Sequence, residues 1–230
     1  MTQHFLFGRR PAPPPSGGPV AIVFANSYPD TTDQTTYTFS SAAIGTASAD
    51  RIVIVVIGSR ANSARSISSV TIAGIAATVI ATANNTGGGA DIVAIYAAAV
   101  PSGTTGNVVI TFSGTMLRCG IGTYAMTGAS SVTPYDTATA VPSGSSASIN
   151  TIDSPANGAI LGASLAGSSG TASVTWTGLT ENFDIQPETS SSGVSGACGD
   201  FASSQTNRTV GVTVGSVLGP QALAVASWGP

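Results

Sequence analysis

Arg51-Ile-Val-Ile-Val-Val-Ile57 carries an apolar side chain at every position after its arginine. Successive side chains of a β-strand point to opposite faces of a sheet, so a run that is apolar throughout predicts a strand covered on both faces. Asn107-Val-Val-Ile-Thr-Phe112, by contrast, partly alternates between polar and apolar residues, which is typical of a strand with one face in water. The chain therefore combines a buried central strand with strands that lie at a surface.

Short β patterns of these two kinds recur along the whole chain after Pro19, and turn residues separate them. No stretch of 12 or more residues keeps the apolar spacing of a helix without a glycine. The fold class that we predict is all-β. The expected strands cover residues 20–24, 37–39, 51–57, 69–72, 77–81, 92–98, 107–112, 119–126, 147–152, 159–165, 173–176, 209–214 and 223–228.

Two arrangements of these strands are open. We expect residues 20–230 to form a single large jelly-roll-like antiparallel β-sandwich. Two tandem smaller sandwiches, divided near residues 128–147, are the alternative. No tandem repeat of fixed period is visible in the sequence, and residues 190–196, which are mostly serine and glycine, are interpreted as a loop.

Residues 1–19 differ in composition from the rest and are predicted to form an extended Pro-rich anchoring arm. The apolar cluster Phe5, Leu6 and Phe7 is followed by the paired charges Arg9 and Arg10. The proline-rich segment 11–15 then favours a stiff polyproline II conformation. An aromatic tip on a stiff stalk predicts docking on another particle, and the competing interpretation is a terminal tail without a function.

Charge is scarce throughout the chain. Charged residues make up 7% of the sequence, with seven arginines, no lysine and ten acids, and the net charge is −3. Nucleic acids and anionic membranes are bound through basic surfaces, so neither is an expected partner. The apolar runs at 52–57 and 94–100 are far shorter than the ~20 residues of a membrane-spanning helix, and no signal peptide pattern is recognisable.

The residue types that most enzymes rely on are missing or isolated. The one histidine, His4, lies in the arm, which argues against a serine or cysteine nucleophile activated by histidine in the folded body. Two cysteines and one remote histidine are too few for a zinc site. We therefore expect no enzyme activity, no cofactor and no metal. The acids Glu181, Asp184 and Glu188 are interpreted as solvated loop residues.

The segment 177–188 has a second interpretation as a site of glycan contact. Trp176 at its edge offers an aromatic surface on which a sugar ring can stack, and Glu181, Asn182 and Asp184 offer acceptors for hydroxyl groups. The competing interpretation places Trp176 in the core or at its rim.

Cys119 and Cys198 are separated by 79 positions. Two buried free thiols are the default for a protein made in the cytoplasm, and a disulfide between Cys119 and Cys198 is the alternative.

With the arm, the Ala/Gly/Ser/Thr-rich strands and the missing active site in view, the chain resembles accessory virion proteins of tailed bacteriophages. The segment Ser69-Val-Thr-Ile-Ala-Gly-Ile-Ala-Ala-Thr-Val79 and residues 96–124 carry this likeness. The resemblance implies assembly in the host cytoplasm, a place on the virion exterior and contacts with capsid, neck or tail proteins.

It also implies a homo-oligomer without a cofactor. The expected function is that of a head decoration, spike, neck or tail protein docked through its arm. The alternative is an adhesin that binds a host surface polysaccharide.

Overall fold

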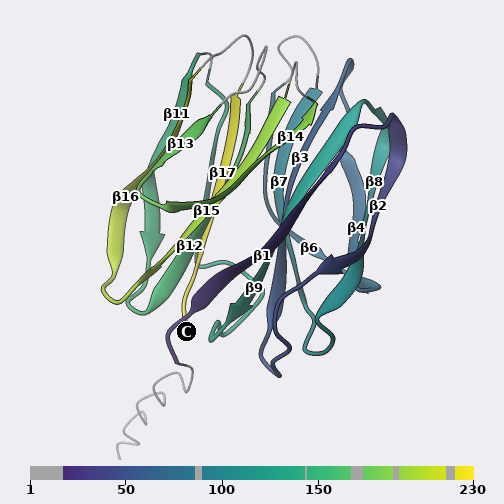
Figure 1. Ribbon diagram of the computed structural model, residues 1–230. Helices are drawn as coiled ribbons and strands as arrows, with labels where there is room; N and C mark the ends of the chain where they lie inside the picture. The colour runs from purple at the N-terminus through teal and green to yellow at the C-terminus, as the bar shows by residue number, and fades with distance from the viewer. Residues whose placement is uncertain (1–17, 86–89, 143, 167–172, 189–191, 216–220) are drawn as a thin grey trace, which may run out of the picture.

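The computed structural model describes residues 18–85, 90–142, 144–166, 173–188, 192–215 and 221–230, and every regular element in these ranges is a β-strand (Figure 1). The all-β prediction is confirmed, and all strand pairs are antiparallel. The strands are β1 (Ala21–Asp30), β2 (Gln34–Ala43), β3 (Ile52–Ala61), β4 (Ile67–Ile72), β5 (Ile75–Ala76), β6 (Thr78–Asn85), β7 (Ala90–Ala99), β8 (Thr105–Met116), β9 (Arg118–Thr127), β10 (Asp136–Ala140), β11 (Ser146–Ser154), β12 (Gly158–Ala166), β13 (Val174–Thr177), β14 (Thr180–Glu188), β15 (Ser192–Phe201), β16 (Gln205–Val214) and β17 (Gln221–Trp228).

The strands form four sheets that stack as four layers. We name them sheet A (β1-β9-β3-β7-β6), sheet B (β2-β8-β4-β5), sheet C (β10-β17-β12-β15-β14) and sheet D (β11-β16-β13). The layers follow one another in the order B, A, C, D, and one apolar core fills each of the three spaces between them (Figure 1).

Strand β3 lies at the centre of sheet A and serves two of these cores. Ile52, Ile54 and Val56 enter the core between sheets A and C. The intervening Val53 and Val55 enter the core between sheets A and B. Both faces are covered, as the uninterrupted apolar run at 51–57 predicts.

The two halves of the chain have the same topology. Sheets A and B use only β1–β9, whereas sheets C and D use only β10–β17. When β10 is matched to β1, β11 to β2, β12 to β3, β13 to β4 and β14–β17 to β6–β9, every pairing of the second half repeats a pairing of the first. Only the two-residue β5 lacks a counterpart. The fold is thus an internal duplication of one sandwich.

A trace of the duplication survives in the sequence. Ser69-Val-Thr-Ile-Ala-Gly-Ile75 at β4 corresponds to Ser173-Val-Thr-Trp-Thr-Gly-Leu179 at β13. Both segments place two side chains in a core and carry a glycine with positive φ at their sixth position, Gly74 at 80° and Gly178 at 84°. That backbone conformation favours glycine, so the shared glycine marks the same turn in both halves.

An approximate two-fold axis relates the halves. Sheets A and C, which are equivalent, face each other, and β3 crosses β12 at their centre. Edge strand β1 lies beside β14, and edge strand β6 lies beside β10. Since β10 corresponds to β1 and β14 corresponds to β6, the two contacts are equivalent under the two-fold axis. The contact therefore has the form of a symmetric homodimer interface within one chain.

The division falls in the linker 128–135, inside the region where the alternative of two tandem sandwiches places it. A single jelly roll would have two sheets, whereas this structure has four, because each half of the chain forms its own two-sheet sandwich. The predicted arm lies outside the described residues apart from its last two, Gly18 and Pro19.

Three further strands and the short β5 escaped the sequence patterns. Residues 177–188 were expected to be a loop, but they contain β14. The serine-rich segment 190–196 was also expected to be a loop, but β15 begins within it, at Ser192. Strand β10 (Asp136–Ala140) was also missed. Strand β15 is rich in glycine, serine and alanine because large neighbours need the space. A Cβ atom at Gly196 would lie 2.5 Å from the Phe183 ring.

Glycines set the separation of sheets A and C. A Cβ atom at Gly122 would collide with the Phe183 ring, whereas at Gly193 the nearest atom would be the Ile185 carbonyl oxygen at 3.9 Å. Gly122→Ala should lower the free energy of unfolding by about 1–3 kcal/mol through overpacking. Gly193→Ala is the matched control and should change it little. Chemical denaturation measures both, and equal stabilities would contradict this account of the interface.

Candidate functional site

The predicted aromatic surface for glycans is not available. Trp176 lies on β13 with 9% of its surface exposed and belongs to the core between sheets C and D. Its Nε1 donates a hydrogen bond to Ser195 Oγ at 2.7 Å, and its ring covers Gly162 so closely that a Cβ atom there would clash. Strand alternation places Trp176 in phase with the buried Val174, so the stacking interpretation is wrong and the core interpretation holds.

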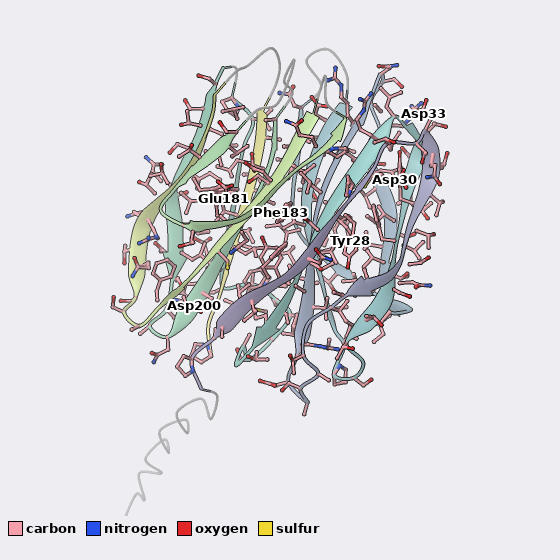
Figure 2. All side chains as sticks on the ribbon, viewed as in Figure 1. Tyr28, Asp30, Asp33, Glu181, Phe183 and Asp200 are labelled. Carbon is pink, nitrogen blue, oxygen red and sulfur yellow. The ribbon has the colours of Figure 1, made fainter. Side chains whose placement is uncertain are left out.

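The polar residues of the same segment lie on β14, an edge strand of sheet C (Figure 2). Asp184 Oδ2 accepts a hydrogen bond from the Val174 backbone N–H at 3.0 Å, which ties β14 to β13. Burial and the nearby Asp184 carboxylate raise the pKa of Glu181. Asn182 is half-buried, and the side chain of Glu188 lies outside the described residues. The structure therefore brings Glu181 and Asp184 together, whereas the Asn182 side chain lies against Cys198. Trp176 supplies no aromatic partner to them.

The two cysteines are free and buried. Cys119 on β9 belongs to the core between sheets A and B, and Cys198 on β15 belongs to the core between sheets A and C. Sheet A thus separates the thiols, and the disulfide alternative is wrong. Burial raises the pKa of Cys198 to about 11, so its thiol stays protonated and unreactive at neutral pH.

A row of charges that the sequence patterns did not reveal crosses sheet A. Asp91 on β7, Arg60 on β3 and Arg118 on β9 are direct cross-strand neighbours, and Arg60 Nε lies 3.9 Å from Asp91 Oδ1. Asp91 is 3% exposed. Its burial raises its pKa from 3.8 to about 6, although both arginines pull the pKa downward.

The strongest candidate for a binding site is the end of the stack where the linker and the C-terminus meet, which we call the terminal face (Figure 1). It consists of residues 19–20, 49–52, 128–135, 155–158, 200–202 and 229–230, and the described part of the chain begins there. Backbone hydrogen bonds hold it together: Ser130 N–H donates to Gly229 O at 3.2 Å, Tyr135 N–H to Ser227 O at 2.7 Å and Val20 N–H to Asn157 O at 2.8 Å.

The described residues of the terminal face line hollows at three places. The largest, about 560 Å³, is lined by Ser130, Thr133, Pro134, Tyr135, Pro155, Ala156, Gly229 and Pro230, and we call it the proline groove. A second, about 380 Å³, lies between residues 49–52 and the linker residues 129–132. The third, about 280 Å³, lies between Pro19–Val20 and residues 157–158 and 200–202. The second and third hollows are counterparts under the two-fold relation. In the second, the linker that leads into β10 crosses the end of the first half. In the third, the residues that lead into β1 cross the end of the second half.

Acids dominate the described part of this face. Asp50, Asp136, Asp153 and Asp200 lie on it or at its rim, and Figure 2 marks Asp200. Hydrogen bonds from the Ser48 hydroxyl and the Gly128 N–H lower the pKa of Asp50, which therefore remains ionised. Arg51 is buried and donates to the carbonyl oxygens of residues 45, 100 and 102, so its charge is used inside the fold.

Arg208, the other arginine at this end, donates to Gly178 O and lies over the Phe201 ring.

The predicted docking residues Phe5, Leu6, Phe7, Arg9 and Arg10 lie outside the described residues. In the described part of the chain, no three His, Cys, Asp or Glu side chains are grouped closely enough to hold a metal ion. The described ranges also contain no helix of the length and apolarity needed to cross a membrane.

No family model and no curated protein matches this chain.

The raised pKa of Asp91 predicts a pH dependence of stability. The folded protein holds the Asp91 proton up to about pH 6, whereas the unfolded chain releases it near pH 4. Stability should therefore fall as pH rises between about pH 4 and pH 6, by about 2–3 kcal/mol for a shift of this size. Asp91→Asn should match the wild type near pH 4 and exceed its unfolding free energy near pH 7. Parallel stability curves for the two proteins would contradict this role of Asp91.

Proposed function

We propose that this chain is a non-enzymatic structural component on the exterior of a phage particle, docked through its N-terminal arm. The observation that carries the proposal is the character of the two broad outer faces, which lie on opposite sides of the four-layer stack. The central outward positions of both faces carry mostly hydroxyl side chains and no charge.

On sheet B, residues alternate between the core and the outside. Tyr37, Val70 and Ile110 point into the core. The positions between them face outward, and Thr36 Oγ1 lies 3.3 Å from Thr111 Oγ1 in a cross-strand pair. The outward positions are Thr36, Thr38, Ser69, Thr71, Val109 and Thr111, and none of them carries a charge.

Sheet D repeats this arrangement on the other side. Val174, Val210 and Val212 point into the core between sheets C and D. The central outward positions are Ser146, Ser148, Thr175, Thr177, Gly211 and Thr213, and these too are uncharged. Asp153, next to the last residue of β11, is the one charged outward position among the described residues of this strand. The two-fold relation between the halves makes sheets B and D equivalent, so one molecule presents the same kind of surface twice.

Neutral hydroxyl faces are suited to lasting contact with neighbouring proteins. Burying a charge is costly unless it is paired, whereas a hydroxyl group can donate and accept hydrogen bonds with whatever it meets. A subunit with two such faces can contact a neighbour on either side, including a second copy of itself. The chain enters the fold at the terminal face, so a docked arm would leave both outer faces free (Figure 1).

The adhesin alternative has lost its main support. Its aromatic surface was Trp176, which is buried and hydrogen-bonded to Ser195. Glu181, Asn182 and Asp184 remain as polar groups on an edge strand, and we propose no glycan site on them.

The arm can be tested directly. A chain without residues 1–16 should still fold and unfold cooperatively on heating, because every strand that the structure describes lies within residues 21–228. The same chain should no longer co-purify with virions, as measured by quantitative mass spectrometry of purified particles. Attachment at wild-type copy number after the deletion would overturn docking through the arm, and absence of the wild-type chain from virions would overturn the whole proposal.

The outer faces give a second, separate test. Thr71→Glu on sheet B and Thr213→Glu on sheet D place a charge within each hydroxyl face, and we expect either change to reduce the number of copies per particle by about tenfold or more. Thr46→Glu, in the exposed turn before β3, is the matched control and should assemble normally. Normal assembly of all three variants would show that the outer faces make no contacts.

A further inference from the structure

The proline groove has the composition of a site for a polyproline segment. Pro134, Tyr135, Pro155 and Pro230 form its apolar surface, and the Tyr135 side chain is 62% exposed. Proline-rich peptides in the polyproline II conformation dock on aromatic grooves of this kind, because they are already extended and lose little entropy on binding. The walls are formed in advance by the hydrogen bonds from Ser130 to Gly229 and from Tyr135 to Ser227.

We propose that the proline groove binds the chain's own segment Arg9-Arg10-Pro-Ala-Pro-Pro-Pro15, so that the arm is held against the terminal face in the free protein. This inference concerns the isolated protein and does not depend on the proposed place on a phage particle.

The arm begins within reach of the groove. Gly18 is exposed, and the Pro19 carbonyl oxygen lies so close to Gly128 that a Cβ atom there would come within 2.5 Å of it. Gly128 is two residues from Ser130, which lines the groove. A five-residue segment in the polyproline II conformation spans about 16 Å, which is the reach of a segment as long as 11–15. Glycine at positions 17 and 18 permits the backbone conformations that a reversal of chain direction requires.

The charges are complementary. The segment carries Arg9 and Arg10, the densest positive charge in the sequence. Asp136 directly follows Tyr135 in the chain, and Asp50 remains ionised beside the linker. The guanidinium groups on this face, Arg51 and Arg208, are engaged with backbone carbonyl oxygens. An arginine pair entering this face would therefore meet carboxylates, and the attraction should weaken as salt is added.

The duplication supports the same path. The linker residues lead into β10, the first strand of the second half. They lie across the end of the first sandwich, beside Asp50 and Arg51. Pro19 and Val20, which lead into β1, take the equivalent path across the second sandwich beside Asn157 and Asp200. The arm is thus directed over the half of the terminal face that contains Pro155 and Pro230.

Limited proteolysis of the full chain tests the proposal. Trypsin cleaves after arginine but not before proline, so the Arg9–Arg10 bond is a built-in reporter of arm exposure, and intact-mass spectrometry detects the loss of residues 1–9. Tyr135→Ala should speed this cleavage by about two- to tenfold, the change expected for one aromatic contact. Tyr135→Phe keeps the ring and should cleave at the wild-type rate. Higher salt should speed cleavage of the wild type.

The control is Val141→Ala, which removes an exposed apolar side chain outside the groove and should leave the rate unchanged. Unaltered melting temperatures show that each variant is folded. Equal cleavage rates for the wild type and Tyr135→Ala would overturn the proposal. Protection that grows with protein concentration would also overturn it, because the occupant would then be the arm of a second copy. A synthetic peptide of residues 11–16, added in excess, should displace the arm and expose the bond.

Discussion

The face-to-face packing of sheets A and C is the contact on which the rest of the molecule depends. Each sheet is apolar on both faces at its central strand, so neither half can stay in water with that inner face uncovered. Glycines allow the two sheets to approach. Gly58 makes room for Val194, and Gly122 makes room for Phe183. Dispersion and burial at this interface are sensitive to single methyl groups, because protein interiors are close-packed.

The symmetry of this interface explains where everything else lies. Facing A against C sends their partner sheets B and D to opposite sides, which creates the two equivalent hydroxyl faces. It also brings the start of β1, the linker and the end of β17 to one end, where the grooves and the acids gather. The neutral sides and the charged end are therefore consequences of one packing arrangement, and they suit different kinds of partner.

Sequence patterns revealed the strands whose apolar side chains stand out and missed those built from small residues. The run at 51–57 predicted a central strand, and the structure confirms it. Strand β15 was hidden because its glycines and serines resemble a loop, although they are needed opposite large rings. Trp176 was interpreted as a ligand surface. Trp176 and the apolar Val174 are two positions apart and therefore share one face of the strand, which already predicted that the indole lies in the core. The duplication escaped notice because topology has been kept far better than residue identity, of which only short matches such as those at 69–75 and 173–179 remain.

The pairing of β1 with β9 has a consequence for synthesis on the ribosome. Ala21 pairs with Thr127, so the first sandwich cannot close its inner sheet until almost all of that half has been made. The second half, which covers the apolar face of sheet A, follows at about 5–20 residues per second, and its roughly 100 residues need about 5–20 s. For that time each nascent chain presents an uncovered apolar sheet that matches the same sheet on its neighbours along a polysome. The linker 128–135 favours the correct outcome, because it keeps the proper partner at a far higher local concentration than any other chain.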